Sequence, residues 1–321
     1  MQNSKNIVNS VECSSIESGI DLFNSHASRI INLSQCKVLV ISEELATLGI
    51  NSYISTLADD AEMSPHANII ISKSSALDFL NFSQPVLEDL TSKYYDLTMV
   101  SNTYSSYTKS VSLINFFSNI HDSFLEPVAS LGSIRSNNEN TQLGILGLVV
   151  FKNGKFACEL TPLETICHMI ISNEFECCKI QVPNPFDENA YMDVEVRLNK
   201  RTKNSVSFIN QTPYISSAIN LSVKILSLGE IITDSSIDYK SDENLKLIEN
   251  SINNYFSTQV YKYLDKVCKQ FGSDIDGFGK YAVKYFSTQE KWSNYNWLEN
   301  YNKSFFDVSV NTTIKSGYSL L

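Results

Sequence analysis

The clearest hydrophobic pattern in the chain is an apolar stripe between residues 241 and 279. Its members recur at steps of three and four residues: Leu245, Ile248, Ile252, Phe256, Val260, Leu264, Val267 and Phe271. This spacing predicts one apolar face of a long helix over residues 242–271. Asp242 and Glu243 favour the positive end of the helix dipole, and Gly272 is suited to the positive φ that ends a helix. We therefore predict a long helix that packs across a sheet.

Alternating patterns on either side of this helix predict strands. Apolar and polar residues alternate over residues 192–198, 219–225 and 306–314, which is typical of strands that are buried on one face. Asn153-Gly154, between two short apolar runs, predicts a hairpin. Thr161-Pro162 followed by Glu164 predicts the start of a helix that continues to about residue 173.

The first half of the chain alternates between strand and helix patterns. The β-branched run 37–41 predicts a strand, Ser42 opens a helix that ends at Gly49, and residues 68–71 form the next expected strand. Strand, helix and strand in this order predict a right-handed βαβ unit. Residues 132–142 have almost no apolar content and are expected to form a linker.

These elements predict an α+β fold of several domains, with mixed and antiparallel sheets packed against helices. We expect an N-terminal α+β domain at residues 1–138, a middle α+β domain at 143–210, and a C-terminal α+β domain with the long helix at 211–321. An alternative in which the last two form one unit stays open. The 321 residues suffice for several domains with cores of their own.

Charge and cysteine content limit the possible partners. The net charge of −10 argues against wide contact with nucleic acid, which needs a basic face. The one compact basic run, residues 197–203, is expected to be a solvated hairpin loop. The seven cysteines include no C-x-x-C pair, so neither a zinc framework nor a disulfide scaffold is expected. We expect no metal and no cofactor.

Residues with catalytic potential do not form a recognisable constellation. His168 follows Cys167 on a predicted helix, where adjacent positions do not face each other, so a core or surface histidine is expected. The stretch 272–279 fails as an EF-hand because two ligand positions lack acidic residues. We expect its aspartates, Asp274 and Asp276, to cap local turns and to bind no metal. The sequence predicts no catalytic site.

An aromatic cluster near the C-terminus is the least ordinary feature. Its members are Phe278, Tyr281, Tyr285, Phe286, Trp292, Tyr295, Trp297, Tyr301 and Phe305. Packing against the long helix is the first interpretation, because aromatic side chains dominate cores. The second is an exposed patch for a partner or a stacking ligand, because Trp and Tyr are enriched at interface hot spots.

Several motifs, in this order and spacing, resemble the Ger(x)C spore germination proteins, the C subunits of nutrient germinant receptors. Residues 147–156 are similar to the family's glycine, apolar run, Phe-Lys and turn, and residues 274–279 to its Asp-x-x-Gly-Phe-Gly stretch. Residues 37–46 are similar to a strand followed by Glu-Glu-Leu-Ala. The positions that match family motifs are Gly147, Phe151, Asp274, Gly277, Gly279, Trp292 and Trp297. We expect most of them to be structural.

The chain departs from this family at its N-terminus. Family members begin with a lipoprotein signal, a lipid-modified cysteine and further sheet-forming residues. Residues 1–15 have no hydrophobic core, and Cys13 lacks the small-residue lipobox. We therefore expect the chain as given to be soluble, without the family's lipid anchor and first strand.

The resemblance implies a three-domain α+β lipoprotein on the outer face of the spore inner membrane, without enzymatic activity. It also implies two partners, the integral membrane subunits of A-type and B-type, in a receptor for amino acids, sugars or other nutrients. The expected function is a non-enzymatic receptor subunit that acts through protein–protein contacts in spore germination. The alternative is direct binding of a small nutrient ligand, which needs a concave pocket with a few polar groups.

Overall fold

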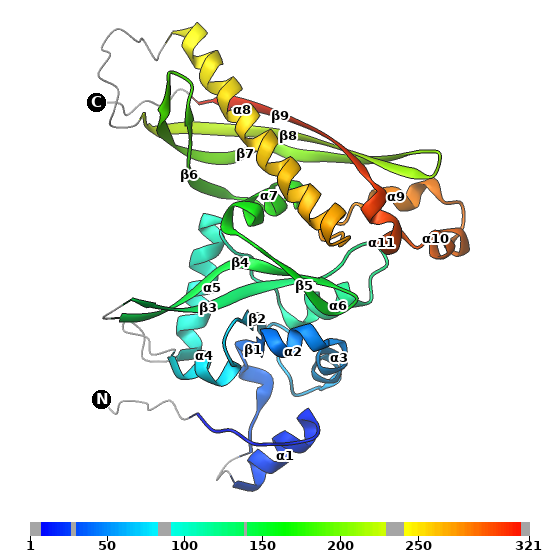
Figure 1. The fold of residues 1–321 in the computed structure, drawn as a ribbon. Helices are drawn as coiled ribbons and strands as arrows, with labels where there is room; N and C mark the ends of the chain where they lie inside the picture. The colour runs from blue at the N-terminus through cyan, green and yellow to red at the C-terminus, as the bar shows by residue number, and fades with distance from the viewer. Residues whose placement is uncertain (1–7, 27–29, 83–90, 138–139, 229–240, 316–321) are drawn as a thin grey trace. The chain divides into compact units, whose positions relative to one another are not determined.

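The structure is a computed structural model that describes residues 8–26, 30–82, 91–137, 140–228 and 241–315. The chain forms two compact units. Unit 1 comprises Met1–Thr103, Thr108–Asp122 and Glu126–Thr161, and unit 2 comprises Tyr104–Tyr107, Ser123–Leu125 and Pro162–Leu321. Each unit packs helices against a sheet, which confirms the predicted α+β class (Figure 1).

Unit 1 is built on a five-stranded sheet, sheet A, with strand order β1-β2-β3-β4-β5. Its strands are β1 (Val38–Ser42), β2 (Asn68–Ser72), β3 (Val128–Asn137), β4 (Asn140–Lys152) and β5 (Lys155–Leu160). The pairs β1–β2 and β2–β3 are parallel, and the pairs β3–β4 and β4–β5 are antiparallel. The parallel β1–β2 pair confirms the predicted strand, helix and strand order.

The helices of this half of the chain are α1 (Ile16–His26), α2 (Glu43–Leu48), α3 (Asn51–Asp59), α4 (Ala76–Phe82), α5 (Thr91–Ser105) and α6 (Leu113–Ile120). Helices α2, α4 and α6 pack on sheet A and α5 joins its core, whereas α1 contacts α3. As predicted, Ser42 caps α2 by accepting a hydrogen bond from the N–H of Leu45, and Gly49 ends it at φ 121°. Ile70 of β2 packs in one core cluster with Phe79 of α4 and with side chains of α5 and β4.

The linker expected over residues 132–142 is wrong, because residues 132–137 belong to β3 and residues 140–142 to β4. Polar composition does not exclude a strand, because main-chain pairing, such as that of Arg135 with Gln142 and of Ser136 with Thr141, holds β3 and β4 together. The expected domain boundary at residues 138–143 falls at this pair. The division into three domains stays a prediction.

Unit 2 is built on a four-stranded sheet, sheet B, with strand order β6-β7-β8-β9. Its strands are β6 (Cys177–Asn184), β7 (Asp187–Ile209), β8 (Thr212–Ser227) and β9 (Phe305–Ile314). Its helices are α7 (Pro162–Ser172), α8 (Asp242–Leu264), α9 (Gly279–Ala282), α10 (Gln289–Tyr295) and α11 (Trp297–Asn300). The pairs β6–β7 and β7–β8 are antiparallel, whereas β9 runs parallel to β8.

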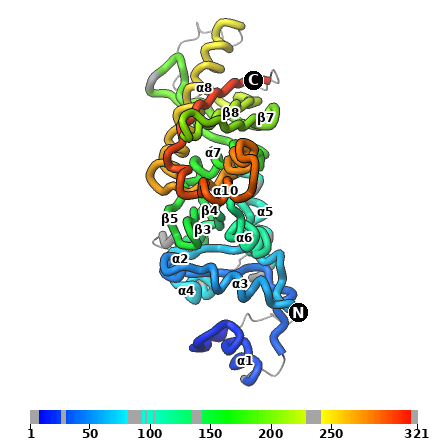
Figure 2. Tube along the Cα trace, turned by 90° about the vertical axis from the view of Figure 1, so that its right-hand side faces the viewer, coloured from blue at the N-terminus to red at the C-terminus, as the bar shows by residue number. Residues whose placement is uncertain are grey.

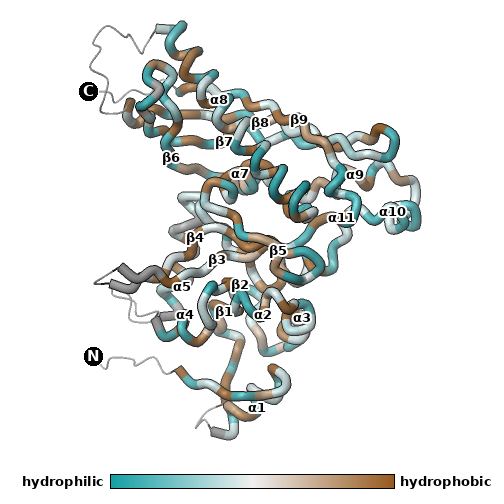
Figure 3. Tube along the Cα trace, viewed as in Figure 1, coloured by the Kyte–Doolittle hydropathy of each residue, from teal (hydrophilic) through white to brown (hydrophobic). Residues whose placement is uncertain are grey.

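Helix α8 lies across sheet B, which confirms the predicted long helix (Figures 1 and 2). A π-helical turn, Asp265–Gln270, continues it, and Gly272 follows at φ 62°. The stripe residues Ile248, Ile252 and Phe256 are fully buried. In Figure 3, hydrophobic and hydrophilic residues alternate along α8.

The basic run 197–203 lies inside β7, so the loop expected there is wrong. Two register shifts, between Leu198 and Lys200 and between Lys200 and Lys203, interrupt the strict alternation of β7. Bulges of this kind hide a strand from a period-of-two pattern. The turn of the hairpin lies instead at Asn210 and Gln211, which have φ values of 49° and 64°.

Both edge strands of sheet B have main-chain groups bound by side chains. On β6, the hydroxyls of Ser106 and Tyr107 each donate a hydrogen bond of 3.0 Å to a main-chain carbonyl. On β9, the side chains of Tyr261 and Glu249 on α8 each accept a hydrogen bond of 3.0 Å from a main-chain N–H. Main-chain groups that point away from the sheet are thereby partly satisfied.

Crossing a bilayer takes a long and strongly apolar helix, and the described residues contain none.

Candidate functional site

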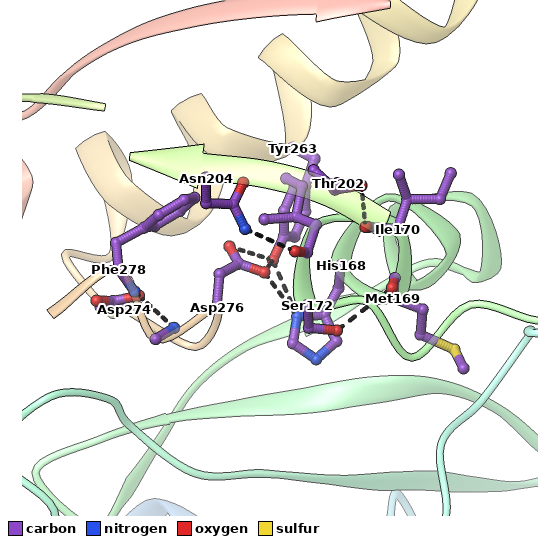
Figure 4. A network of polar contacts seen from close by, with 12 residues as sticks. His168, Met169, Ile170, Ser172, Thr202, Asn204, Tyr263, Asp274, Asp276 and Phe278 are labelled. Carbon is purple, nitrogen blue, oxygen red and sulfur yellow. Dashed lines mark hydrogen bonds and ion pairs between the residues drawn. The ribbon is translucent and has the colours of Figure 1, made fainter. Parts of the chain in front are cut away.

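The loop after the π-helical turn holds a fully buried carboxylate, Asp274 (Figure 4). Its Oδ1 accepts hydrogen bonds from the main-chain N–H groups of Gly277 at 2.9 Å and Phe278 at 3.2 Å. Its Oδ2 accepts from the N–H of Gly279 at 2.9 Å and from Nε1 of Trp297 at 2.8 Å. One side chain therefore caps the start of α9 and fixes residues 272–279, named here the motif loop, to α11.

The environment of Asp274 contains opposing influences on its ionisation. Burial raises the pKa of this carboxyl from 3.8 to about 7, and the charge of Asp276 acts in the same direction. Hydrogen bonds from Trp297 and from two main-chain N–H groups lower the pKa, but by less than burial raises it. A proton on Asp274 is therefore exchanged near neutral pH.

The second aspartate of the loop, Asp276, has different partners. Its carboxylate accepts hydrogen bonds of 2.9 Å from the hydroxyl of Tyr263 on α8 and lies 2.9 Å from Nδ1 of His168 on α7. The side chains of His168 and Asp276 are 1% and 0% exposed. The expectation that Asp276 caps a local turn is wrong, because Asp274 alone receives the loop's N–H groups.

This His168–Asp276–Tyr263 network joins two helices and the motif loop inside unit 2 (Figure 4). Burial raises the pKa of Tyr263 well above 10, with Asp276 as the next cause, so the phenol stays protonated and donates. A histidine whose Nδ1 faces a carboxylate has the orientation of a general base. Here the remaining ring nitrogen, Nε2, is buried and has no hydrogen-bond partner among the described residues.

A partly exposed ion pair lies next to this network. Nζ of Lys266 contacts the two carboxylate oxygens of Glu164 at 2.9 and 2.8 Å, which ties the start of α7 to the π-helical turn. Both side chains are about one quarter exposed, at 24% and 23%. Across the described ranges, no group of three or more His, Cys, Asp or Glu side chains is placed to hold a metal ion.

The aromatic cluster divides into a buried part and an exposed part. Trp292 and Trp297 stack with ring centroids 6.1 Å apart, and Trp297 also contacts Tyr301 at 5.8 Å. These three rings are buried, whereas Tyr285 is 59% exposed and Phe305 is 53% exposed. The three buried rings agree with a packing role, whereas binding of a partner or a stacking ligand by the exposed rings stays a prediction.

The remaining motif residues, Gly147 and Phe151, lie on β4 in unit 1. Gly147 has a φ of 88°, and a Cβ there would lie 2.2 Å from the carbonyl oxygen of Leu160. The buried ring of Phe151 meets Phe116 edge to face at 5.1 Å. The structure thus brings together five of the seven motif residues in unit 2 and places these two in unit 1.

Sequence reasoning missed the partners of Asp276. Tyr263 falls three residues after Val260, in step with the apolar stripe of α8, so its burial could have been predicted. His168 carries no such signal, because Thr165–Ile171 are all buried. The helix therefore has no alternation of buried and exposed faces that would distinguish His168 from its neighbours.

Unit 1 contains a cleft of about 580 Å³ between α1 and α3. Its lining combines the apolar side chains of Ile16 and Ile20 with the carboxylates of Glu17, Asp21, Asp59 and Asp60. The cleft is lined by residues of unit 1, whereas the aromatic cluster, the alternative platform for a ligand in the sequence analysis, belongs to unit 2.

Comparisons with known proteins relate both units to spore germination proteins. The family described as "Spore germination B3/ GerAC like, C-terminal" matches residues 146–317, and the "Spore germination protein N-terminal domain" matches residues 1–134. The spore germination protein GerQC of Bacillus cereus is 18% identical over 289 residues, which cover 88% of this chain and 75% of that protein. The crystal structure of the GerBC protein has the same fold, with a TM-score of 0.62 at 12% identity over 87% of this chain and 78% of that chain. Since the family matches extend over both units, the chain belongs to the GerAC-like, or Ger(x)C, family of spore germination proteins.

Proposed function

We propose that this chain is a non-enzymatic subunit of a spore nutrient germinant receptor. It acts through protein–protein contacts with two integral membrane subunits, of A-type and B-type, at the outer face of the spore inner membrane. Family membership supports the assignment to spore germination. The resemblance to receptor C subunits supports the proposed receptor complex and its location.

The observation that carries the proposal is an exposed apolar surface on α4 and α5. Leu77 of α4 is 44% exposed, and Leu97 and Val100 of α5 are 45% and 52% exposed. Phe79 of α4 and Tyr95 of α5 stack with ring centroids 5.9 Å apart, so the two helices contact each other. Apolar side chains that gather on one surface mark sites of protein contact. We name Leu77, Leu97 and Val100 the α4–α5 surface.

The polar network of unit 2 supports a structural role for the motif positions. The carboxylates of Asp274 and Asp276 are buried, and each is bound by donors of the same unit. A catalytic group has to reach its substrate, and a buried, hydrogen-bonded carboxylate does so only if the site opens. We propose that the seven motif residues maintain the fold and that partner contact uses other residues.

Co-purification tests the proposal. The tagged, lipid-anchored full-length protein is isolated from spore membranes and scored for both integral subunits. We expect the wild type to recover both, and the double variant Leu97→Ser/Val100→Ser to recover at least about tenfold less, which corresponds to the loss of a small apolar contact. Leu247→Ser on α8, a residue that is 46% exposed, is the matched control.

The outcomes separate the two parts of the proposal. Recovery of neither subunit by the wild type, from fully solubilised membranes, would mean that the chain does not act in such a receptor. Equal recovery by the wild type and the double variant would retain the receptor but remove the α4–α5 surface as its contact.

Direct binding of a small nutrient is a second candidate, and the cleft between α1 and α3 favours it. Its carboxylates and apolar floor suit a molecule with an amine and a short apolar part, as many amino acids have. Calorimetric titration of a panel of amino acids against the wild type and Asp59→Asn/Asp60→Asn tests this. Heat of binding that the double variant loses supports it, and a panel without heat of binding rejects it.

A further inference from the structure

The basic run of β7 lies on the face of sheet B that points away from α8. Lys200 pairs with Asn220 and Lys203 pairs with Ala218, and these positions of β8 alternate with the buried Ile219. Because successive side chains of a strand point to opposite faces, both lysines lie opposite the core. Both are exposed, and neither forms an ion pair within the described part of the chain.

Other charges on this face lie mostly toward its far end. Arg197 is paired there with Glu195 at 2.9 Å. Glu195 lies in register between two further lysines, one on β6 and one on β8, and Asp193 lies beyond it. On β9, Asp307 is the acidic residue nearest the hairpin tip on this face. The half of the face near the tip therefore has more cations than carboxylates.

Exposed apolar side chains stand on the same face at the hairpin tip. Ile209, the last residue of β7, is 54% exposed. Tyr214 pairs in register with Phe305 of β9, and their rings stack with centroids 5.2 Å apart although they are 37% and 53% exposed. Nζ of Lys269 lies 5.0 Å from the ring centroid of Phe305. Lys269 thus borders the apolar tip, and Ser205 and Ser207 separate the tip from Lys203 on the same face of β7.

The tip is held in a fixed geometry. Asn210 and Gln211, both at positive φ, form a two-residue turn, and the hydroxyl of Tyr295 on α10 donates to the carbonyl of Gln211 at 3.2 Å. Behind it, Phe208 packs against the ring of Phe286 at 5.6 Å. The tip lies beside α9 and α10 (Figure 1). A surface fixed in this way needs no ordering when it binds, which favours binding.

We propose that the hairpin-tip surface, made of Lys200, Lys203, Ile209, Tyr214, Lys269 and Phe305, docks on an anionic lipid surface. Lysines near an anionic bilayer are attracted to its headgroups, and aromatic rings with a polar edge settle at headgroup depth. An acidic peptide matches the lysines but not the apolar tip, and a neutral apolar partner matches the tip but not the lysines. This inference does not depend on the proposed receptor contacts.

The net charge of the whole chain gives this surface an orienting role. At a net charge of −10 the protein as a whole is repelled by an anionic bilayer. Screening limits that repulsion to about 10 Å at moderate salt. A local cationic face is attracted once it lies within that distance, so only one orientation of unit 2 is favoured at the surface.

Sedimentation with vesicles tests the inference on the full chain. We expect binding to vesicles of equimolar phosphatidylglycerol and phosphatidylcholine, weakened by salt, and no binding to pure phosphatidylcholine. Lys200→Glu/Lys203→Glu should bind at least about 20-fold more weakly, since each lysine near an anionic surface contributes about fivefold or more. Ile209→Ser should weaken binding about fivefold and leave the salt dependence unchanged.

The control is Lys246→Glu/Lys262→Glu, because it changes the net charge equally at exposed positions of α8. We expect it to bind like the wild type. Equal weakening by the control pair would reduce the effect to net charge and overturn the inference. The same holds if the wild type binds neither kind of vesicle. A third outcome is that the wild type binds poly-glutamate but no vesicles, and that Lys200→Glu/Lys203→Glu abolishes this binding. That result would assign the surface to an acidic protein instead.

Discussion

Trp297 donates its indole N–H to Asp274 across 2.8 Å in a place closed to solvent. The two residues are 23 positions apart in the sequence. Their contact fixes the motif loop to α11. Asp274 and Trp297 are both positions that match family motifs. A donor and a buried carboxylate paired in this way depend on each other, because each is costly to bury alone.

Trp297→Phe removes that donor while keeping most of the ring. At pH 8, where the carboxylate is ionised, we expect a loss of about 2–4 kcal/mol in the free energy of unfolding, from the lost charged hydrogen bond and a small cavity. Urea unfolding measures it. Trp292→Phe is the control, since Nε1 of Trp292 donates at 3.0 Å to the neutral hydroxyl of Ser123. Equal losses would mean that the charge of Asp274 contributes nothing.

The raised pKa of Asp274 predicts a pH dependence of stability. The folded chain keeps a proton up to about pH 7, whereas the unfolded carboxyl releases it near 3.8. The free energy of unfolding should therefore fall as pH rises from about 4 to 7, by up to about 4 kcal/mol, and level off above. Asp274→Asn should lack this component. Parallel pH profiles for wild type and variant would contradict the prediction.

Phe256 is fully buried on the sheet-facing side of α8. Replacing it with alanine should cost about 3–5 kcal/mol, as removal of a large core side chain does. Leu247→Ala, at a position that is 46% exposed on the same helix, should cost less than about 1 kcal/mol. Thermal and urea unfolding compare the two, and a loss below about 1 kcal/mol for Phe256→Ala would show that this face is not core.

A comparison of Gly147 with Gly277 distinguishes two costs of adding a Cβ, backbone strain and steric overlap. Both have positive φ, but a Cβ would meet the carbonyl oxygen of Leu160 at 2.2 Å from Gly147 and no atom closer than 3.6 Å from Gly277. Gly277→Ala should therefore cost about 1–2 kcal/mol from φ alone. Gly147→Ala should cost at least about 3 kcal/mol, because overlap adds to strain. The reverse order in urea unfolding would falsify this account.

The turn between β7 and β8 contains a position where a substitution should stabilise the protein. Gln211 has a φ of 64°, a region that glycine occupies without strain, and only its main-chain carbonyl is used by Tyr295. Gln211→Gly should therefore raise the free energy of unfolding by about 1 kcal/mol. Gln211→Ala keeps the Cβ and should give no gain. A gain of the same size from alanine would point to the side chain rather than to φ.

Local patterns were sufficient for elements whose signals are local. The stripe of α8, the Ser42 cap and the Asn153-Gly154 turn depend on residues within a few positions of one another, and each is found where it was predicted. The α+β class followed from the same patterns. The parallel pairing of β8 with β9 could not be predicted, because the residues between them carry no signal for which strand edge is reached.

The site illustrates the same limit. The stretch 272–279 marks two aspartates as special, but its spacing does not tell which one receives the loop's N–H groups and which one meets His168. That choice depends on how α7 and α8 approach the loop, which is a matter of tertiary packing. The bulges of β7 had the same effect on the basic run, since each extra residue shifts the side chains to the other face.

The side chains that bind the outer strands of sheet B restrict how a partner can attach. A peptide that joins a sheet as an additional strand needs a row of unpaired main-chain donors and acceptors. Ser106 and Tyr107 occupy carbonyls on one border, and Tyr261 and Glu249 occupy N–H groups on the other. A partner that adds a strand to either border of sheet B would have to displace these hydrogen bonds, which disfavours such addition by a binding peptide or by a second copy of the sheet in an aggregate.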